Sequence, residues 1–242
     1  MEMTDPNLTI VGHGRVGGSL AAAAERAGVA VGPGASAVLL CVPDDAIRQA
    51  CEDLAGDVPD FVGHVSGACG LDALTAAGDR GSKLFSIHPL QTFPTSDTPI
   101  EGTPCAISAD DPAAVELARD LAERLGMRPF EIPEQVRGEY HAAAAMASNF
   151  LIAIEEAAVE LLARAGIDDG RELLSPLVLR SAANWSEQGG EALTGPIARG
   201  DRETIARHRD AIGRSWPELL DTYDMLAKIT AKVASAKGAR PE

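Results

Sequence analysis

Short apolar runs of the β type recur through the first half of the chain and alternate with segments of helical pattern. The strand-like runs are residues 8–11, 37–42, 61–65, 83–87, 104–108 and 128–132. The helical segments are residues 19–27, 46–54, 71–77 and 112–125. This alternation is typical of an α/β fold with a doubly wound, mainly parallel sheet that carries helices on both faces.

Strand patterns stop after Pro133, and the remaining sequence is helical. Residues 134–165 predict one long helix, and its middle, residues 142–154, carries no charged residue. A helix that is apolar on all sides is expected to be buried. Capping and breaking residues predict three more helices, which begin near Asp168-Asp169, Asp201 and Ser215. We therefore expect an α/β domain over residues 1–133 and an all-α C-terminal domain over residues 134–242.

Composition narrows the choice of partners. The formal net charge is −15, and an acidic chain repels nucleic acid and anionic membranes. The uncharged run 142–154 is too short for a membrane span, and the polar N-terminus has no signal-peptide pattern. The four cysteines form no CxxC pair, so we expect no metal site and a reducing cytoplasm. A small-molecule substrate is the expected partner.

A glycine-rich turn follows the first strand-like run. Its sequence, Gly12-His13-Gly14-Arg15-Val16-Gly17, has the GxGxxG spacing and leads into a helix. In this context the motif predicts a Rossmann-type dinucleotide-binding domain, in which a pyrophosphate lies against the glycines and the helix N-terminus. The alternative is a plain tight turn. The candidate cofactor-binding residues, including two after the next strand-like run, are Gly12, Gly14, Arg15, Val16, Gly17, Val42 and Pro43.

The next segment departs from the usual dinucleotide-binding pattern. A second strand normally ends in an acidic residue about 20 positions beyond the glycines, where it binds the adenosine ribose. Here no Asp, Glu, Lys or Arg occurs between Arg26 and Asp44. A vestigial strand at residues 29–31 is all that the sequence allows. The choice between NAD and NADP is therefore not fixed by the sequence.

His88 and Ser66 are the first catalytic candidates. His88 follows the strand-like run 83–87, just before Pro89, and Ser66 follows the run 61–65. Ligands of open α/β sheets bind outside the carboxyl ends of the strands. Histidine also has an unperturbed pKa near neutrality, which suits proton transfer. The alternative is a histidine in a surface loop.

Two resemblances extend this reading. Ser66 together with His88-Pro89 resembles prephenate dehydrogenases, in which a serine and the histidine of a His-Pro motif meet the substrate hydroxyl. Four motifs in order also resemble bacterial proteins that pair a Rossmann-like domain with domain of unknown function 2520. That resemblance implies an NAD(P)-dependent oxidoreductase, with a ketopantoate reductase type among the family. The four motifs are residues 86–93, 140–143, 147–149 and 193–201.

The predicted long helix adds further candidates. His141 and Ser148 are seven positions apart and share a helix face, with Asn149 next to them. Related hydroxyacid and ketopantoate dehydrogenases carry a catalytic lysine and an asparagine on the equivalent helix. No lysine is available here, so either His141 replaces it or His88 acts alone, and His141 and Asn149 become catalytic candidates. The alternative is that these polar groups hydrogen-bond one another inside the fold. The candidate substrate-binding residues are Gln91, Ser148, Thr194 and Arg199.

Two functions remain open on the sequence. The first is a cytoplasmic NAD(P)-dependent oxidoreductase that acts on a small keto or hydroxy acid, with His88 as the acid/base. The second is a degenerate, non-catalytic Rossmann relative that binds a metabolite as a dimer. In both, the apolar helix predicts a homodimer through the helical domain.

Overall fold

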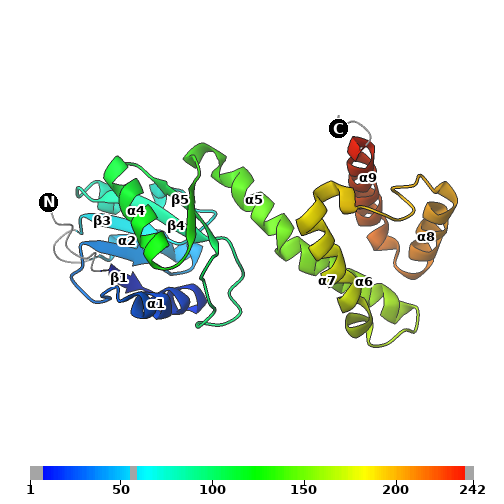
Figure 1. Ribbon diagram of the computed structural model, residues 1–242, viewed down its shortest axis with the longest axis horizontal. Coiled ribbons are helices and arrows are strands. Elements are labelled where there is room, and N and C mark those ends of the chain that lie inside the picture. The colour runs from blue at the N-terminus through cyan, green and yellow to red at the C-terminus, as the bar shows by residue number, and fades with distance from the viewer. Residues whose placement is uncertain (1–7, 55–58, 238–242) are drawn as a thin grey trace. The chain divides into compact units, whose positions relative to one another are not determined.

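The N-terminal part of the chain forms a six-stranded sheet in a computed structural model that describes residues 8–54 and 59–237. The strands follow one another in sequence order across the sheet (Figure 1). The first four are parallel, β5 runs antiparallel to β4, and β6 is parallel to β5. The predicted mainly parallel sheet is confirmed. The strands are β1 (Leu8–Val11), β2 (Ala37–Leu40), β3 (Phe61–His64), β4 (Lys83–Pro89), β5 (Pro104–Ala109) and β6 (Arg128–Glu131).

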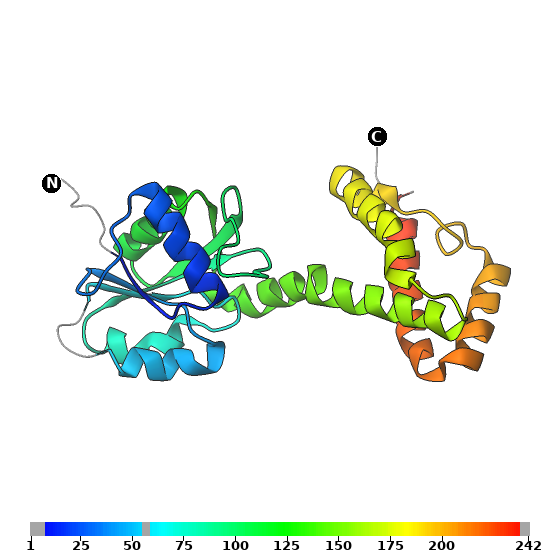
Figure 2. The same ribbon diagram turned by 90° about the horizontal axis from the view of Figure 1, so that it is seen from below.

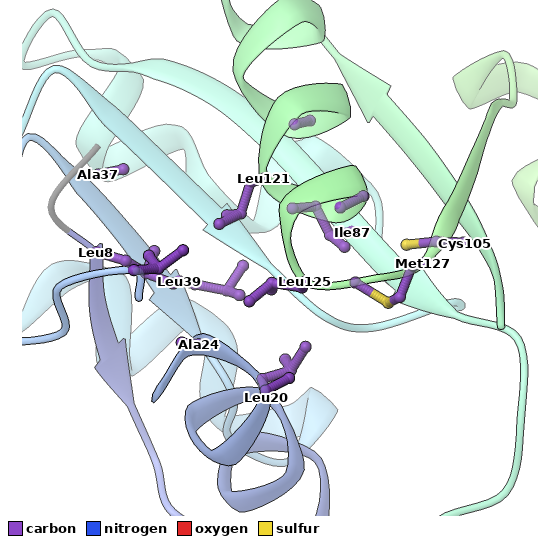
Figure 3. Close-up of a cluster of buried hydrophobic side chains, with 14 of the residues drawn as sticks. Leu8, Leu20, Ala24, Ala37, Leu39, Ile87, Cys105, Leu121, Leu125 and Met127 are labelled. Carbon is purple, nitrogen blue, oxygen red and sulfur yellow. The ribbon is translucent and has the colours of Figure 1, made fainter. Parts of the chain in front are cut away.

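Helices cover both faces of this sheet, so it is doubly wound as predicted. On one face, α1 (Arg15–Ala27) and α4 (Pro112–Arg124) bury Leu20 and Leu121 against Leu39 and Ile87 (Figure 3). On the other face lie α2 (Ile47–Glu52), the 3₁₀ turn η2 (Leu71–Leu74) and α3 (Thr75–Gly78) (Figure 2). Side chains of β2 alternate between the two cores because successive residues of a strand point to opposite faces.

The edge beside β1 keeps a remnant of the missing strand. Val31 forms a single parallel bridge with Leu8, supported by hydrogen bonds from Leu8 N to Ala30 O and from Gly32 N to Leu8 O, both 3.0 Å. The Thr9 hydroxyl also donates to Gly32 O. The chain then turns through Gly34, whose φ is +79°, and enters β2 with no helix in between. The vestigial strand expected from the sequence is therefore present, one residue pair long.

The described residues divide into two compact units, one that ends at Ser148 and one that begins at Asn149. The predicted domain boundary after Pro133 coincides with the end of the strands. The compact division falls later because side chains of η3 (Glu134–Val136) and α5 (Arg137–Ala147) hydrogen-bond the sheet and its loops. Arg137 and Tyr140 of α5 hydrogen-bond Ser86 and His88 of β4. The first turns of α5 thus belong to the α/β unit.

The predicted single helix over residues 134–165 is interrupted. Ser148 has φ −124° and ψ −70°, between α5 and α6 (Asn149–Arg164). Its hydroxyl donates to Ala144 O at 2.9 Å, a side-chain bond that competes with the regular helical pattern. The expected burial is also wrong for the single chain, since Phe150, Leu151 and Ile152 are all exposed.

The second unit is entirely helical (Figure 2). Within it, α6 packs against α7 and α8, and α8 packs against α9. The Asp201 carboxylate accepts from Thr204 N at 3.0 Å and caps α8 as predicted, whereas Asp169 has a φ of +59° and makes no side-chain cap. Besides α6, its elements are α7 (Gly170–Gln188), η4 (Gly189–Ala192), α8 (Arg202–Ser215), η5 (Pro217–Leu219) and α9 (Leu220–Lys237).

One helical segment within the described residues, Glu134–Arg164, is long and apolar enough to cross a membrane by length and composition alone. Its most apolar window has a mean hydropathy of 1.4, and none of that window is buried in the single chain. The core helix of a soluble protein passes the same test, so one such segment is weak evidence for a membrane span.

Candidate functional site

A cavity of about 490 Å³ lies at the carboxyl ends of the parallel strands, within the α/β unit. Its walls come from the turns that follow β1, β2 and β3, from the end of β4, and from α5. Nine of the residues selected from the sequence line it together: Gly14, Arg15, Val16, Val42, Pro43, Ser66, His88, Gln91 and His141. The cavity therefore connects the glycine turn with His88.

The three glycines of the turn have three different physical roles. Gly12 has a φ of +96°, and a Cβ there would lie 2.5 Å from Cys41 O. A Cβ on Gly17 would lie 1.9 Å from Gly12 O, so only glycine lets α1 pack so closely on β1. A Cβ on Gly14, by contrast, would meet nothing within 4 Å. Gly14 thus leaves open space at the N-terminus of α1, where amide groups and the helix dipole favour an anion.

These residues fit the pyrophosphate of a dinucleotide but offer less to its adenosine half. No side chain caps the N-terminus of α1, and its first turn holds no acidic residue. The remnant strand at Val31 supplies neither an acidic group for ribose hydroxyls nor a basic group for a 2′-phosphate. Arg15 lines the cavity and is the nearest cation in sequence to the turn.

His88 is held by a tyrosine from α5. Its Nδ1 lies 2.6 Å from the Tyr140 hydroxyl, and the two rings meet edge to face with centroids 5.6 Å apart. Burial lowers the pKa of His88 from 6.5 to about 4, and the nearby His141 and Arg137 act in the same direction. The imidazole is therefore neutral at physiological pH, whereas its residue type alone suggested an ionisation near neutrality.

Gly67 lies against both imidazoles of the site. A Cβ on Gly67 would come within 2.7 Å of Cε1 and 2.8 Å of Nε2 of His88, and within 2.9 Å of Cδ2 of His141. The two histidine rings are 6.2 Å apart between centroids. Their approach to this loop depends on the absence of a side chain at Gly67, so the Nε2 edge of His88 lies beside a residue of the cavity wall.

Ser66 is buried and shapes the loop after β3. Its hydroxyl accepts hydrogen bonds from Ala68 N at 3.1 Å and Cys69 N at 2.9 Å. Its backbone N donates to Nδ1 of the buried His64, at 3.2 Å, and the other ring nitrogen of His64 donates to Gly70 O. Burial lowers the pKa of His64 to about 4, so this ring stays neutral. Since the Ser66 hydroxyl oxygen accepts both of these bonds, its proton is available to donate to a ligand.

An ion pair with a buried arginine connects the start of α5 to these loops. Arg137 is only 4% exposed; it donates to Ser86 Oγ at 2.7 Å and to Ser66 O at 3.3 Å, and it pairs with Glu134. Glu134 in turn accepts from Leu71 N at 3.2 Å. Burial would raise the pKa of Glu134, but hydrogen bonds from Arg137 and its neighbours outweigh burial and lower it. Removing Glu134 would leave the charge of Arg137 buried and uncompensated.

The structure places the other predicted residues differently. The Gln91 amide donates to Pro99 O at 3.0 Å and accepts from Thr103 Oγ1 at 2.7 Å, so both ends of its side chain hold the loop beside the cavity. Ser148 lies at the helix break. The remaining three candidates, Asn149, Thr194 and Arg199, belong to the second compact unit.

Sequence reasoning missed Tyr140, Arg137, Gly67 and His64 as parts of the site. Tyr140 stood beside His141 in one of the motifs, and Arg137 lies three residues earlier. Positions i, i+3 and i+4 share a helix face, so this face carried a detectable signal. His64 and Gly67 flank Ser66 in sequence, and their roles depend on ring and Cβ positions that no pattern reports.

Comparison with protein families gives one match. Residues 103–230 match the family described as Domain of unknown function (DUF2520). No curated protein matches the chain.

Solved structures show the same fold over nearly the full length. A protein of Bacteroides fragilis named as an NADP oxidoreductase is 19% identical, with a TM-score of 0.78 over 94% of this chain and 98% of that one. Protein TM1727 of Thermotoga maritima is 23% identical, with a TM-score of 0.78 over 95% and 99%. Prephenate dehydrogenase of A. aeolicus, solved with hydroxyphenyl propionate and NAD⁺, is 17% identical, with a TM-score of 0.55 over 95% and 98%.

Proposed function

Because the chain belongs to the DUF2520 family and joins a glycine turn to a held histidine in one cavity, we propose that it is an NAD(P)-dependent oxidoreductase. Its substrate in this proposal is a small keto or hydroxy acid. The observation that carries the proposal is that Gly14, Val42, Ser66 and His88 line the same cavity. Structural neighbours named for NADP or solved with NAD⁺ support the same cofactor class.

The cofactor would lie along the carboxyl ends of the strands. Its pyrophosphate would sit over Gly14 at the start of α1, and its nicotinamide near Val42, Pro43 and Ser66. A bound nicotinamide would supply or accept a hydride. Arg15 is the residue best placed to meet a phosphate at the mouth of the turn.

His88 would act on the reacting oxygen of the substrate. As a neutral ring bound at Nδ1 by Tyr140, it can present an Nε2–H to a carbonyl oxygen and stabilise negative charge as the carbonyl is reduced. The Ser66 hydroxyl proton and His141 would contact the same oxygen or its neighbour. These are hydrogen-bond donors rather than metal ligands.

An acidic substrate needs a cation for its carboxylate. Among the described residues lining the cavity, Arg15 is the only arginine or lysine, and it lies at the cofactor end. The sequence candidates for carboxylate binding, Arg199 with Thr194, and for substrate orientation, Asn149, belong to the second unit and stay predictions. Gln91 and Ser148 keep a supporting role, through the loop and the helix break that they shape.

Turnover of carbonyl compounds tests the function directly. We expect the purified protein to oxidise NADPH or NADH in the presence of ketopantoate or another small 2-keto acid. The reaction is measured as the loss of reduced-nicotinamide absorbance. Absence of turnover across 2-keto acids, 2-hydroxy acids and their uncharged analogues would overturn the proposal.

A second candidate is a non-catalytic relative that binds a metabolite. The observation in its favour is the single bridge at Val31, which leaves the adenosine half of a dinucleotide without a ribose-binding side chain. In that case the cavity would bind a small molecule but none of the four nicotinamide nucleotides. Binding assays with the nucleotides separate the two candidates.

We expect the protein to be a cytoplasmic homodimer that pairs through the helical unit, with no nucleic-acid or membrane partner. Phe150 is 57% exposed, Leu177 63% and Trp185 66% in the single chain, and large apolar side chains left exposed on neighbouring helices favour an interface. Light scattering at micromolar concentration should give twice the mass of one chain. A monomer in that measurement would contradict the expectation.

A further inference from the structure

We infer that Tyr140 is a positioning residue that fixes His88 in the tautomer with its proton on Nε2, so that the cavity receives a hydrogen-bond donor. The inference deepens the proposed function, because it states which form of His88 would meet the substrate. It concerns a contact between α5 and β4, both inside the α/β unit.

The hydrogen bond between the two side chains sets the proton positions. The Tyr140 hydroxyl and His88 Nδ1 are 2.6 Å apart. Within the described part of the chain, the hydroxyl makes no other hydrogen bond. If Nδ1 carried the ring proton, the proton of the partly buried tyrosine hydroxyl would lack a protein acceptor, which disfavours this arrangement. If the hydroxyl donates, both groups are satisfied and the ring proton is left on Nε2. Burial also raises the pKa of Tyr140 to about 12, which keeps the hydroxyl protonated.

Aromatic packing holds the tyrosine in this orientation. Phe130 of β6 contacts Tyr140 edge to face, with centroids 6.2 Å apart and an interplanar angle of 67°. His88 meets the tyrosine ring at 88°. Such contacts limit rotation of the tyrosine, and the hydroxyl therefore stays directed at Nδ1.

The Arg137 bonds set the register of α5 against β4. Arg137 and Tyr140 are one helical turn apart, and Ser86 and His88 are two residues apart on the same face of the strand. The contacts pair in order: Arg137 donates to Ser86 at 2.7 Å, and Tyr140 bonds His88. A shift of α5 along the strand would break both contacts together. Arg137 therefore fixes the position of α5 that allows Tyr140 to bond His88.

The charged and titratable groups around His88 favour its neutral form. On α5 these are Tyr140, His141 and Arg137, and His64 and Asp44 come from β3 and the turn after β2. Only Asp44 favours the imidazolium, and burial acts most strongly against it. A neutral imidazole carries one ring proton, and donation from the Tyr140 hydroxyl to Nδ1 favours the tautomer with that proton on Nε2.

Nitrogen NMR of the uniformly ¹⁵N-labelled protein tests this without cofactor or substrate. Long-range ¹H–¹⁵N correlations report which ring nitrogen carries the proton, and the His88 signals are assigned by their loss in His88→Asn. We expect His88 to be protonated at Nε2 in the wild type. In Tyr140→Phe, where the donor is lost, we expect both tautomers to be populated.

The chain contains a matched control. Tyr223 and His208 form the same kind of pair in the second unit, with Oη and Nδ1 2.9 Å apart and ring centroids 6.0 Å apart. Tyr223→Phe should change the His208 signals and leave those of His88 unaltered.

Each outcome decides the inference. A wild-type His88 with its proton on Nδ1 would overturn it, as would an unchanged His88 tautomer in folded Tyr140→Phe. The wild-type spectrum alone suffices if the variant does not fold. Because no turnover is measured, a protein that lacks oxidoreductase activity can still pass this test. Where activity is present, Tyr140→Phe should lower kcat about 5-fold, the equivalent of one net hydrogen bond, with KM little changed.

Discussion

Gly67→Ala is expected to lower kcat/KM about 100-fold while the protein stays folded, an effect of the size that a 1 Å misplacement of a reacting group can produce. The added Cβ would lie 2.7–2.8 Å from two ring atoms of His88 and 2.9 Å from His141. The His88 ring cannot yield cheaply because Tyr140 holds its far side. The backbone of Gly67 has no positive φ, so alanine is conformationally allowed and the effect is confined to the site.

Gly138→Ala is the matched control. Gly138 is an exposed position of α5, and a Cβ there would meet nothing within 4 Å. Steady-state kinetics and thermal unfolding of both variants separate the effects. Overpacking at Gly67 should lower the unfolding free energy by about 1–3 kcal/mol. Gly138→Ala should leave the kinetics unchanged and raise the unfolding free energy by up to about 1 kcal/mol, because alanine favours the helix. Unaltered kinetics in a folded Gly67→Ala protein would show that the His88 ring is not at the reacting centre.

Removal of the imidazole at His88 is expected to have the largest effect on rate. His88→Ala and His88→Asn should each lose roughly 10²–10³-fold in kcat, because a hydrogen-bond donor that stabilises charge on the reacting oxygen contributes about that much. Dinucleotide affinity should stay within a few-fold, since the pyrophosphate would lie against the glycine turn and not against His88. His208, an exposed histidine of the second unit, provides the control. His208→Ala should keep the wild-type rate.

The pH dependence follows from the lowered pKa of His88. Because that pKa falls from 6.5 to about 4 in the fold, the ring stays neutral above about pH 5, and the rate per folded molecule should show no His88 ionisation near pH 6.5. Between about pH 6.5 and 4 the unfolded chain binds more protons than the folded chain, so stability should decrease as the pH falls through that window. If His88→Ala only lowers the melting temperature and turnover is unchanged, His88 has a structural role alone.

The fold follows from local patterns and was accessible from the sequence. The apolar runs ending near Val11, Leu40, His64 and Pro89 each become a strand of the sheet, because burial on both faces selects continuous apolar stretches. The break at Ser148 was not accessible. The residues around it have high helical propensity, and a hydroxyl that bonds the preceding turn leaves no distinct sequence pattern.

The site was accessible only in part. His88 and the glycine turn were found because a parallel sheet brings the carboxyl ends of its strands together. Tyr140 was missed as the partner of His88 because that contact depends on where α5 lies on the sheet, which the buried Arg137 determines. Gln91 was selected by its place in a motif, yet its amide is used by the neighbouring loop. The sequence pattern locates the ends of the strands, whereas the hydrogen-bond partners of a side chain are known only from the three-dimensional structure.

Calorimetric titration with NADPH, NADH, NADP⁺ and NAD⁺ tests the central claim most directly, namely that the glycine-turn cavity binds a nicotinamide dinucleotide. We predict binding with little preference between NAD and NADP forms, because the remnant strand at Val31 supplies no residue that distinguishes them. Gly14→Ala should weaken binding about 10-fold or more, equal to about 1.4 kcal/mol, because its Cβ would fill the space left for the pyrophosphate, and Gly138→Ala should bind as the wild type does. Failure of all four nucleotides to bind the wild-type protein, or equal binding by Gly14→Ala, would contradict the account.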